Sequence, residues 1–361
     1  MQASNNTQAM IDKSIEISVK GKWIEVPALD VNGKTIIVKK KFVKLAIIEA
    51  EEWLESELED PDLYVRTLKD RSHRLRADIF TFAQKLPGSP PKYEYPMEWA
   101  SVAAIHLTTF SDWWEKLPQE SRKNVRRSQK RGVVVTVRDL DDDLVRGIIG
   151  VNNDSPVRQG TRYSHYGKTF EQVKKDQSSF LDRSAFICAY FGDELIGFMK
   201  LVFSGEVASI LQILPKASHQ DKRPANALIA KAVELCEARG MSYLTYGLLN
   251  YGKKRESSLK DFKVRNGFEE MLTPRFYVPL TPWGYVSMKL KIHQGLRGLL
   301  PQRVIKLAVW ARTKWYSRKL FTSRCSSMPE RSNCNRQTEC SNPPAGSNPQ
   351  VPTVNNQQTL S

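Results

Sequence analysis

The chain has 361 residues, of which 40% are hydrophobic and 26% charged, and its formal net charge is +16 at pH 7. This length suits two domains or one large one, and the composition excludes a disordered body. Five scattered cysteines exclude a disulfide framework, and no apolar run approaches the roughly 20 residues that span a bilayer. The positive charge favours anionic partners such as nucleic acid, anionic lipid or a phosphate-bearing metabolite.

The first third of the chain carries secondary-structure signals but no readable motif. Residues 1–12 are polar, which predicts a flexible N-terminus, and without a cationic start and an apolar run we expect no signal peptide and a cytoplasmic protein. Residues 22–45 alternate around the pair Asn32-Gly33, which indicates a hairpin. Further along we expect helices at 47–58 and 73–85, a break at 86–91 and a buried strand at 98–108.

A strongly basic helix is expected at 119–131, where Gly132 ends it, followed by a strand at 133–137 and a helix at 139–149. Within the basic helix Arg122 stacks on Arg126, and Lys123 on Arg127, at i, i+4 spacing. Like charges at this spacing repel by roughly 0.2–0.5 kcal/mol, so a nearby anion would stabilise the helix. A solvated basic surface is the competing interpretation.

The segment 150–170 lacks periodicity, and a loop of this length is often functional. Its second half gathers cationic and aromatic side chains, among them Arg158, Arg162, Tyr166 and Lys168. His165 lies between them, and because histidine titrates near neutral pH it is a candidate general base. The alternative is that His165 is an ordinary surface residue.

The pattern from residue 185 onward predicts a definite order of elements. Three strands at 185–191, 195–203 and 207–214, separated by turns that contain glycine, form an antiparallel meander. A helix then starts at Pro224, a favourable first helical residue, and keeps one apolar stripe until Gly240. A strand at 242–249, a helix at 257–266 and a final strand pair opened by Phe268 complete the order.

The C-terminal part divides into two segments. Residues 283–324 hold ten Lys or Arg and no Asp or Glu, with apolar residues between them. This amphipathic segment predicts either contact with an anionic membrane surface or a helix packed back on the domain with its cations reaching solvent. Residues 325–361 have no aromatic residue and predict a disordered tail, whose three cysteines match no standard zinc spacing, so we expect no metal site.

This order of elements resembles the second half of the GNAT N-acetyltransferase fold. In that family the turn before the central helix reads Gln/Arg-x-x-Gly-x-Gly/Ala, and its N–H groups bind the pyrophosphate of coenzyme A. The matching stretch here is 220–225, in which Gln220 and Ala225 fit the pattern while Arg223 and Pro224 depart from it. The resemblance implies a cofactor-binding turn in which Lys222 and Arg223 hold a phosphate by their side chains. An ordinary turn with solvated charges remains the alternative.

A second resemblance concerns the last helix. Phe262 and Lys263, followed by Gly267, are similar to the Fem-type branch of aminoacyl transferases, where ordinary GNAT enzymes have a tyrosine in place of Lys263. The resemblance implies that Phe262 contributes to the donor site and that Lys263 stabilises negative charge near the transferred ester, as acyl transfer requires. An exposed helix lysine is the competing interpretation. The basic helix 119–131 is also Fem-like.

The Fem-like resemblance implies an α+β fold of two tandem GNAT-like halves, the first degenerate, in which helices flank a mixed sheet. We expect the degenerate half at 13–138 and the acyltransferase domain at 139–282, with the substrate cleft between them. The loop that contains Arg158, Arg162, Tyr166 and Lys168 would then lie where acceptor substrates bind.

The expected function is transfer of an acyl group, from acetyl-CoA or a similar acyl-CoA, to an amine in cell-envelope or polysaccharide metabolism. A Fem-like transferase that uses aminoacyl-tRNA is the first alternative. The second is a non-catalytic basic protein that binds nucleic acid or an anionic envelope. The partners that follow are a phosphate-bearing acyl donor, an unidentified amine acceptor, tRNA under the first alternative, and the inner membrane surface through 283–324.

Overall fold

The computed structural model describes residues 10–294, except 20, 41, 71, 89, 159–160 and 251–257, and also the short strand 354–355. Residues 10–12, expected to be flexible, begin the first strand. Most of the basic segment 283–324 and nearly all of the expected disordered tail lie outside the described residues.

Within the described residues, thirteen strands form one mixed sheet. Their bounds are β1 (Met10–Val19), β2 (Lys22–Val31), β3 (Lys34–Lys40), β4 (Lys44–Ile48), β5 (Ile79–Ala83), β6 (Met97–His106), β7 (Val133–Arg138), β10 (Ser184–Phe191), β11 (Glu194–Ser204), β12 (Val207–Pro215), β13 (Tyr243–Leu248), β14 (Glu269–Pro279) and β15 (Val354–Asn355). The order is β1-β2-β3-β4-β5-β14-β6-β13-β12-β11-β10-β7, with β15 paired to β12 off this path. A separate pair consists of β8 (Val157–Arg158) and β9 (Thr161–Arg162).

The helices connect these strands. The α-helices are α1 (Pro61–Lys69), α2 (Phe110–Lys116), α3 (Gln119–Lys130), α4 (Asp142–Asn152), α5 (Phe170–Gln177), α6 (Pro224–Ala238), α7 (Ser258–Arg265) and α8 (Pro282–Lys289). Four 3-10 turns are η1 (Glu51–Trp53), η2 (Leu181–Arg183), η3 (Ala217–Lys222) and η4 (Ile292–Gln294).

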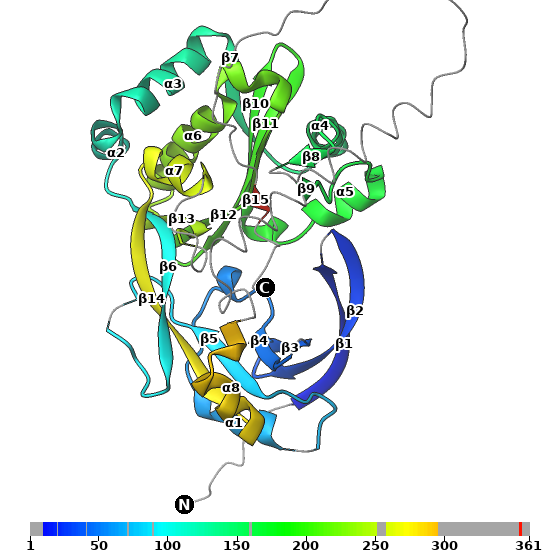
Figure 1. The fold of residues 1–361 in the computed structure, drawn as a ribbon. Helices are drawn as coiled ribbons and strands as arrows, with labels where there is room; N and C mark the ends of the chain where they lie inside the picture. The colour runs from blue at the N-terminus through cyan, green and yellow to red at the C-terminus, as the bar shows by residue number, and fades with distance from the viewer. Residues whose placement is uncertain are drawn as a thin grey trace, which may run out of the picture.

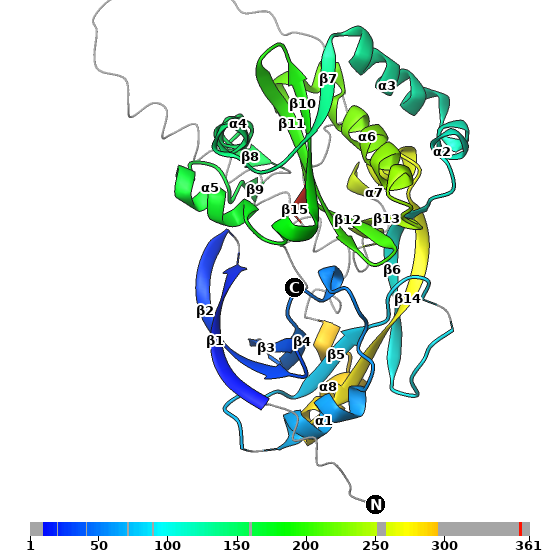
Figure 2. The ribbon, with the colours of Figure 1, turned by 180° about the vertical axis from the view of Figure 1, so that it is seen from behind.

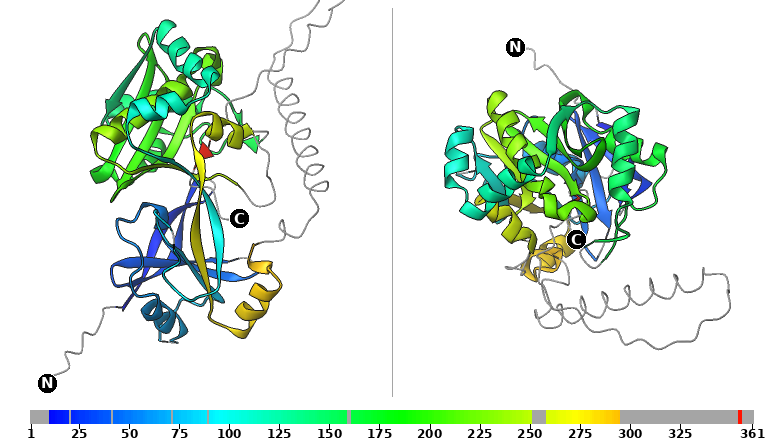
Figure 3. Two further views of the ribbon diagram at one scale, coloured as in Figure 1. Left: turned by 90° about the vertical axis from the view of Figure 1, so that its left-hand side faces the viewer. Right: turned by 90° about the horizontal axis from the view of Figure 1, so that it is seen from above.

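The elements form two lobes, which the long antiparallel strands β6 and β14 connect (Figure 1; Figure 3). One lobe, here the upper lobe, contains β7, β10–β13 and α2–α7; the lower lobe contains β1–β5, α1 and α8. The linking strands serve both cores: Ile105 of β6 belongs to the upper core, whereas Phe276 of β14 packs with Phe80 and Phe82 in the lower core. Each lobe therefore has its own apolar centre on a shared sheet.

Helices cover both faces of the upper sheet (Figure 1; Figure 2). Because side chains alternate along a strand, Ile187 and Ala189 of β10 pack toward α6, while Phe186 and Cys188 pack toward α4. The helices α2 and α3 lie on the α6 side, and α5 lies beside α4 on the other side.

The hairpin of β1 and β2 reaches from the lower lobe to α5 in the upper lobe (Figure 1). The Trp23 indole N–H donates to Oδ1 of Asp176 at 2.9 Å, and Lys175 bonds to Glu16 at 2.7 Å. At the turn between the strands Gly21 has φ of +77° and lies against Ser164, so a side chain there would clash with the Ser164 backbone. The hairpin thus joins the two lobes in addition to β6 and β14.

The predicted GNAT-like mixed sheet flanked by helices is confirmed, and so is the hairpin at Asn32-Gly33, where both turn residues have positive φ. The helices predicted at 47–58 and 73–85 are wrong. The first region ends β4 and contains η1, and the second contains β5, whose residues are buried on both faces. The nearby helix is α1, which Asp60 caps through the Leu63 N–H and Pro61 opens.

The strand β6 precedes the division at residue 138 that the sequence suggests, yet it pairs with β13 and β14. The helices α2 and α3 likewise pack in the upper core with α6 through Trp113, Leu117 and Val125. The upper lobe therefore takes elements from both sides of residue 138, and the exact domain limits stay a prediction.

Candidate active site

The centre of the upper sheet opens where β12 and β13 separate. The two strands run parallel but pair only from Val207 to Ser209 on β12 and from Tyr243 to Thr245 on β13. Past Ser209, β12 continues to Pro215 and remains paired with β11 along its other edge. Beyond Ser209 this edge of β12 is therefore not paired with β13.

The short strand β15 shows that this edge can pair. It lies antiparallel to β12, with Val354 opposite Ile213 and Asn355 opposite Gln212. Since β11 occupies the other edge of β12 at these residues, β15 pairs on the edge that β13 leaves. An extended backbone or a similar polar chain fits the same place by strand addition.

Lys263 lies at the end of β13 beside this opening. The strand is irregular there, because its register with β6 shifts between Thr245 and Leu248 and Gly247 has φ of +54°. The Lys263 Nζ donates to the carbonyl oxygens of Tyr246 at 2.5 Å and Leu248 at 2.7 Å. The lysine thus satisfies carbonyls at a distorted strand end, as buried main-chain groups require.

The side chain of Lys263 is 0% exposed and its Nζ lies 4.3 Å from the centre of the Tyr246 ring. The alternative of an exposed helix lysine is therefore wrong. Burial lowers the pKa of Lys263 from 10.5 to about 7, and the negative charge of Glu52 acts in the opposite direction. An ammonium that can lose its proton near neutral pH is a frequent property of a reactive site.

The turn that opens α6 has a left-handed residue at its centre. Arg223 has φ of 54° and ψ of 42°, a conformation that favours glycine. This explains why related patterns place a glycine at the position of Arg223. Its carbonyl accepts the N–H of Asn226 at 3.2 Å and of Ala227 at 3.5 Å, while Pro224 has no N–H.

The main chain of this turn therefore offers few N–H donors to a pyrophosphate, and its cationic side chains are better placed to bind one. The Nε of Arg223 is buried and has no hydrogen-bond partner among the described residues. The Lys222 Nζ lies 4.5 Å from the ring centre of Phe191, and Arg131, which follows α3, bonds to the side chain of Asp221 at 2.7 Å. Gln220 is half-buried, and Ala225 is buried.

A pair of buried amides joins the turn to the helix of Lys263. The Asn226 Nδ2 donates to Oδ1 of Asn266 at 2.9 Å, and Asn266 in turn donates to the carbonyl of Phe262 at 2.7 Å. Phe262 packs partly buried against the upper core. The structure thus brings the two motifs, 220–225 and 262–267, to neighbouring helix ends. The cofactor-binding role of Gln220, Lys222, Arg223, Ala225 and Phe262 stays a prediction.

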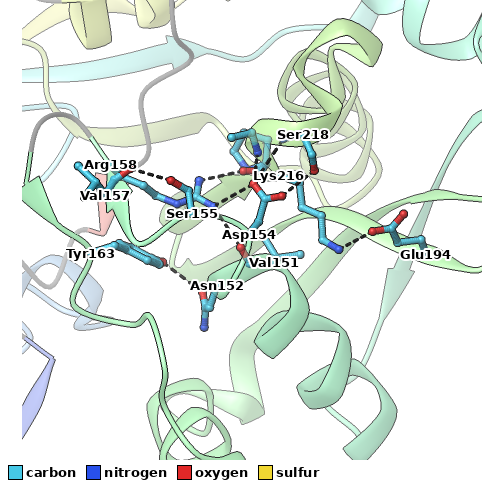
Figure 4. A network of polar contacts seen from close by, with 12 residues as sticks. Val151, Asn152, Asp154, Ser155, Val157, Arg158, Tyr163, Glu194, Lys216 and Ser218 are labelled. Atoms are coloured by element: carbon cyan, nitrogen blue, oxygen red, sulfur yellow. Dashed lines mark hydrogen bonds and ion pairs between the residues drawn. The ribbon is translucent and has the colours of Figure 1, made fainter. Parts of the chain in front are cut away.

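The loop that contains Arg158 is placed on the α4 side of the sheet (Figure 4). The Arg158 guanidinium donates to the carbonyls of Pro215 at 3.0 Å and Val151 at 3.1 Å, which ties the end of β12 to α4. Nearby Asp154 accepts the N–H of Ala217 at 2.5 Å and the hydroxyl of Ser218 at 2.6 Å. These contacts give Arg158 a structural place at the end of β12, and its role toward substrate stays a prediction.

His165 and Lys168 converge on Asp176. The Nδ1 of His165 lies 3.2 Å from Oδ2 of Asp176, and the Lys168 Nζ donates to the same oxygen at 2.5 Å. His165 is 3% exposed, so the alternative of a surface histidine is wrong. Burial acts to raise the pKa of Asp176, but the hydrogen bonds from His165 and Lys168 hold it below its usual value.

The remaining residues of the loop lie apart from this cluster. Arg162 is exposed, and Tyr166 is 41% exposed. The Asp176 cluster packs on the α5 side of the sheet, whereas Lys263 and the turn 220–225 lie on elements of the α6 side. The roles of His165 as a base and of Arg162, Tyr166 and Lys168 as acceptor ligands remain predictions.

Two further charged residues, one on β11 and one on η1, were not predicted from the sequence. Lys200 of β11 is 0% exposed, donates to the carbonyls of Gln177 at 2.7 Å and Ser179 at 2.5 Å, and has its pKa lowered by burial to about 7. A lone lysine inside the apolar run 195–203 was a usable signal for it. Glu52 of η1, whose negative charge raises the pKa of Lys263, is not marked by any local sequence pattern.

The meander β10-β11-β12, the helix α6, the parallel strand β13, the helix α7 and the strand β14 follow one another as the resemblance implied, and β12 separates from β13 at the middle of the sheet. The fold is GNAT-like. No protein-family model matches the chain, and no curated protein matches it.

Solved structures resemble the chain at low identity. FemX has a TM-score of 0.48 and 12% identity, over 77% of this chain and 90% of that chain. The C-terminal domain of a putative lysylphosphatidylglycerol synthetase from Agrobacterium fabrum has a TM-score of 0.46 and 12% identity, over 72% and 85%. A tandem GNAT protein from the clavulanic acid biosynthesis pathway has a TM-score of 0.40 and 9% identity, over 72% and 83%. These likenesses concern the arrangement of elements and carry no information on substrate.

Within the described residues, no helix combines the length and apolar character needed to cross a membrane.

Proposed function

We propose that the GNAT-like protein transfers an acyl or aminoacyl group from a phosphate-bearing carrier to an amine. The observation that carries the proposal is the buried ammonium of Lys263, which lies at the end of β13 where β12 and β13 part. In this chemistry the amine attacks the acyl carbonyl directly, and the protein supplies positioning and electrostatic stabilisation.

The edge of β12 beyond Ser209 and the side chain of Lys263 have separate tasks in this proposal. The edge beyond Ser209 holds the extended part of the donor by hydrogen bonds to its amide-like groups, as it pairs with β15. The carbonyl of the acyl group then lies near Lys263, whose positive charge stabilises the oxyanion that forms during attack. Loss of one such donor typically costs about 10²–10³ in kcat.

The turn 220–225 favours an aminoacyl-tRNA over an acyl-CoA as the donor. Pro224 has no N–H, and the N–H groups of Asn226 and Ala227 donate to the Arg223 carbonyl, so few main-chain donors face an incoming pyrophosphate. The side chains of Lys222 and Arg223 instead suit the spaced phosphates of a polynucleotide, and the net charge of +16 suits one as well. The acyl-CoA alternative makes a different prediction about binding.

Calorimetric titration with coenzyme A, combined with a transfer assay, separates the two donors. The assay supplies acetyl-CoA or alanyl-tRNA with hydroxylamine, glucosamine or a lysine-containing tripeptide as acceptor. We expect no binding heat with coenzyme A at millimolar concentration. We also expect transfer from alanyl-tRNA, with a rate that falls as the salt concentration rises. Micromolar binding of coenzyme A with transfer from acetyl-CoA would instead assign the thioester donor.

Transfer from neither donor to any acceptor would refute the proposal. Binding of tRNA without transfer would then favour the non-catalytic basic protein. A place in cell-envelope or polysaccharide metabolism follows only if a peptide or amino-sugar acceptor is used.

A further inference from the structure

The helix α8 lies on the outer side of the lower lobe, beside β14, and packs with only one of its sides (Figure 3). Gly284 and Ser287 on the packed side are buried. Gly284 comes so close to the lobe that an added Cβ would lie 2.0 Å from the Asp78 carbonyl oxygen, and its N–H donates to the hydroxyl of Thr281 at 3.0 Å. These contacts determine which side of α8 faces solvent.

The solvent-facing side of α8 is apolar. Trp283, Val286 and Leu290 are exposed and follow one another at i, i+3 and i+7, so they form one stripe along the helix. Phe42, between β3 and β4, adds a fourth large side chain, which is 70% exposed. Its carbonyl accepts the Trp283 indole N–H at 3.3 Å, which joins it to the stripe.

We call these four residues the α8 patch. Exposed apolar side chains that occur singly are normal on a soluble protein. A group of large ones side by side marks an interaction surface instead.

Positive charge borders the α8 patch. The Lys289 Nζ lies 4.8 Å from the centre of the Tyr285 ring, and both side chains are exposed. Lys291, after the end of the helix, is exposed as well. The sequence 283–324 holds ten Lys or Arg and no Asp or Glu, with apolar residues between them. The patch therefore belongs to a stretch of chain that is both apolar and cationic.

This combination fits an anionic bilayer better than a protein partner. Trp and Tyr prefer the interface of a membrane with water, because each has a large apolar ring and one polar group. Lysines beside them reach the headgroups, where anionic lipid attracts them. A protein partner would need carboxylates opposite every cation along 283–324, whereas an anionic lipid surface is negative everywhere.

We propose that the α8 patch docks the protein on an anionic lipid bilayer. Phe42, Trp283, Val286 and Leu290 enter the interface, and Lys289 and Lys291 bind the headgroups, as in proteins that lie on a membrane without crossing it. The proposal extends the membrane contact expected for 283–324 to side chains of the lower lobe. It does not depend on the proposed acyl transfer, since vesicle binding needs neither donor nor acceptor.

The test is sedimentation of the full chain with vesicles. One set contains equal parts of phosphatidylglycerol and phosphatidylcholine, and the other contains phosphatidylcholine alone. The variants are Phe42→Ser, Trp283→Ser and the two combined. Trp99→Ser is the matched control, because Trp99 on β6 is 47% exposed and Trp283 is 46% exposed. Unfolding in urea shows that each variant is folded.

We expect the wild-type protein to bind the mixed vesicles and to bind phosphatidylcholine far more weakly. The combined variant should bind the mixed vesicles at least about tenfold more weakly, because two large apolar side chains no longer leave water. Trp99→Ser should bind as the wild-type protein does.

A second pair of substitutions tests the charge and leaves the apolar stripe intact. Lys289→Gln combined with Lys291→Gln should weaken binding to the mixed vesicles by about tenfold at low salt. The difference from the wild-type protein should shrink at high salt, where the attraction is screened.

Several results would overturn the proposal. Absence of wild-type binding to mixed vesicles, or equal binding to both kinds of vesicle, would contradict an anionic bilayer as the partner. Unchanged binding in the folded combined variant would mean that other parts of the chain bind lipid. A dimer that Trp283→Ser converts to a monomer in sedimentation velocity would assign the patch to a second copy of the chain. None of these results bears on acyl transfer, which the donor assays test separately.

Discussion

The side-chain amide of Asn226 donates to Oδ1 of Asn266 at 2.9 Å, and both residues are buried. This bond joins the first turn of α6 to the residue that follows α7. Through it the phosphate-binding candidates of the turn 220–225 are held next to Lys263, three residues before Asn266. In the proposed reaction, two buried amides therefore set the position of the turn 220–225 relative to Lys263.

Replacement of either amide should destabilise the protein. Asn226→Ala and Asn266→Ala each leave a buried polar partner unsatisfied, which costs about 1–3 kcal/mol. The double variant should cost less than the sum, because neither group is then left unpaired. Urea unfolding of the four proteins measures this coupling. Additive losses would mean that the bond contributes nothing to the joint between α6 and α7.

The activity should fall as pH rises through about 7. Burial lowers the pKa of Lys263 to about 7, so the ammonium that stabilises the oxyanion is present below this pH and lost above it. Arginine stays protonated, so Lys263→Arg should keep a reduced activity without this alkaline fall. The pH profile of kcat in both proteins tests this. An alkaline fall that persists in Lys263→Arg would belong to another group.

The free energy of unfolding should rise between about pH 7 and pH 10.5. In this window the unfolded chain keeps a proton on Lys263 that the folded chain has lost, and stability rises wherever the unfolded state binds more protons. Lys200, with its pKa also lowered to about 7, adds the same trend. Urea unfolding at several pH values measures the slope, which Lys263→Met and Lys200→Met should each reduce. Equal slopes in all three proteins would contradict these pKa shifts.

Replacement of Asp176 should strongly lower the free energy of unfolding. The carboxylate accepts from Trp23 and Lys168 and lies 3.2 Å from the His165 ring, all in the interior of the joint between the β1–β2 hairpin and α5. Asp176→Ala leaves a buried cation without its partner, so we expect a loss of about 3–5 kcal/mol. The exposed pair of Asp143 and Arg146 is the control, and Asp143→Ala should cost at most about 1 kcal/mol.

The Asp176 carboxyl should also make the free energy of unfolding depend on pH under acidic conditions. Because the folded pKa of Asp176 lies below its usual value, its stabilising effect is present above the unfolded pKa and is lost as pH falls through the folded pKa. Asp176→Asn should weaken this acidic loss. A variant that unfolds in acid like the wild-type protein would contradict the role of the cluster.

Substitutions of Arg223 should affect the stability of the protein and its affinity for tRNA in different ways. Glycine adopts its left-handed conformation without a steric cost, so Arg223→Gly should be more stable than Arg223→Ala by about 1–2 kcal/mol. If the guanidinium holds a donor phosphate, both variants should lose affinity for tRNA to the same degree. Urea unfolding and filter binding at fixed salt measure the two effects. Equal stability would mean that the turn changes its conformation in the variants.

Local patterns predicted the upper lobe well, because turns at Gly192 and Gly205 separate the apolar runs of β10, β11 and β12, and because Pro224 opens α6 and Gly240 follows it. The lower lobe was harder. Residues 79–83 are buried on both faces and carry no alternation, so the local pattern predicts a helix although they form β5. There the strand pairing with β14, nearly 200 residues away, decides the structure.

Prediction of the candidate site from the sequence was limited in the same way. The motif at Lys263 was visible in the sequence, but its burial depends on the irregular end of β13. The loop 156–168 appeared to be one acceptor site, whereas Arg158 binds the end of β12 and His165 binds Asp176. Glu52 could not be found from sequence, since its place depends on contacts of η1 with β11 and η2 across the two lobes.

The most direct test of the account is transfer from alanyl-tRNA or acetyl-CoA to hydroxylamine by the wild-type protein, by Lys263→Met and by the surface control Lys231→Met. The account predicts transfer by the wild-type protein and the control, and a kcat at least about 100-fold lower in folded Lys263→Met. Equal rates in Lys263→Met and the wild-type protein would contradict the role given to the buried ammonium.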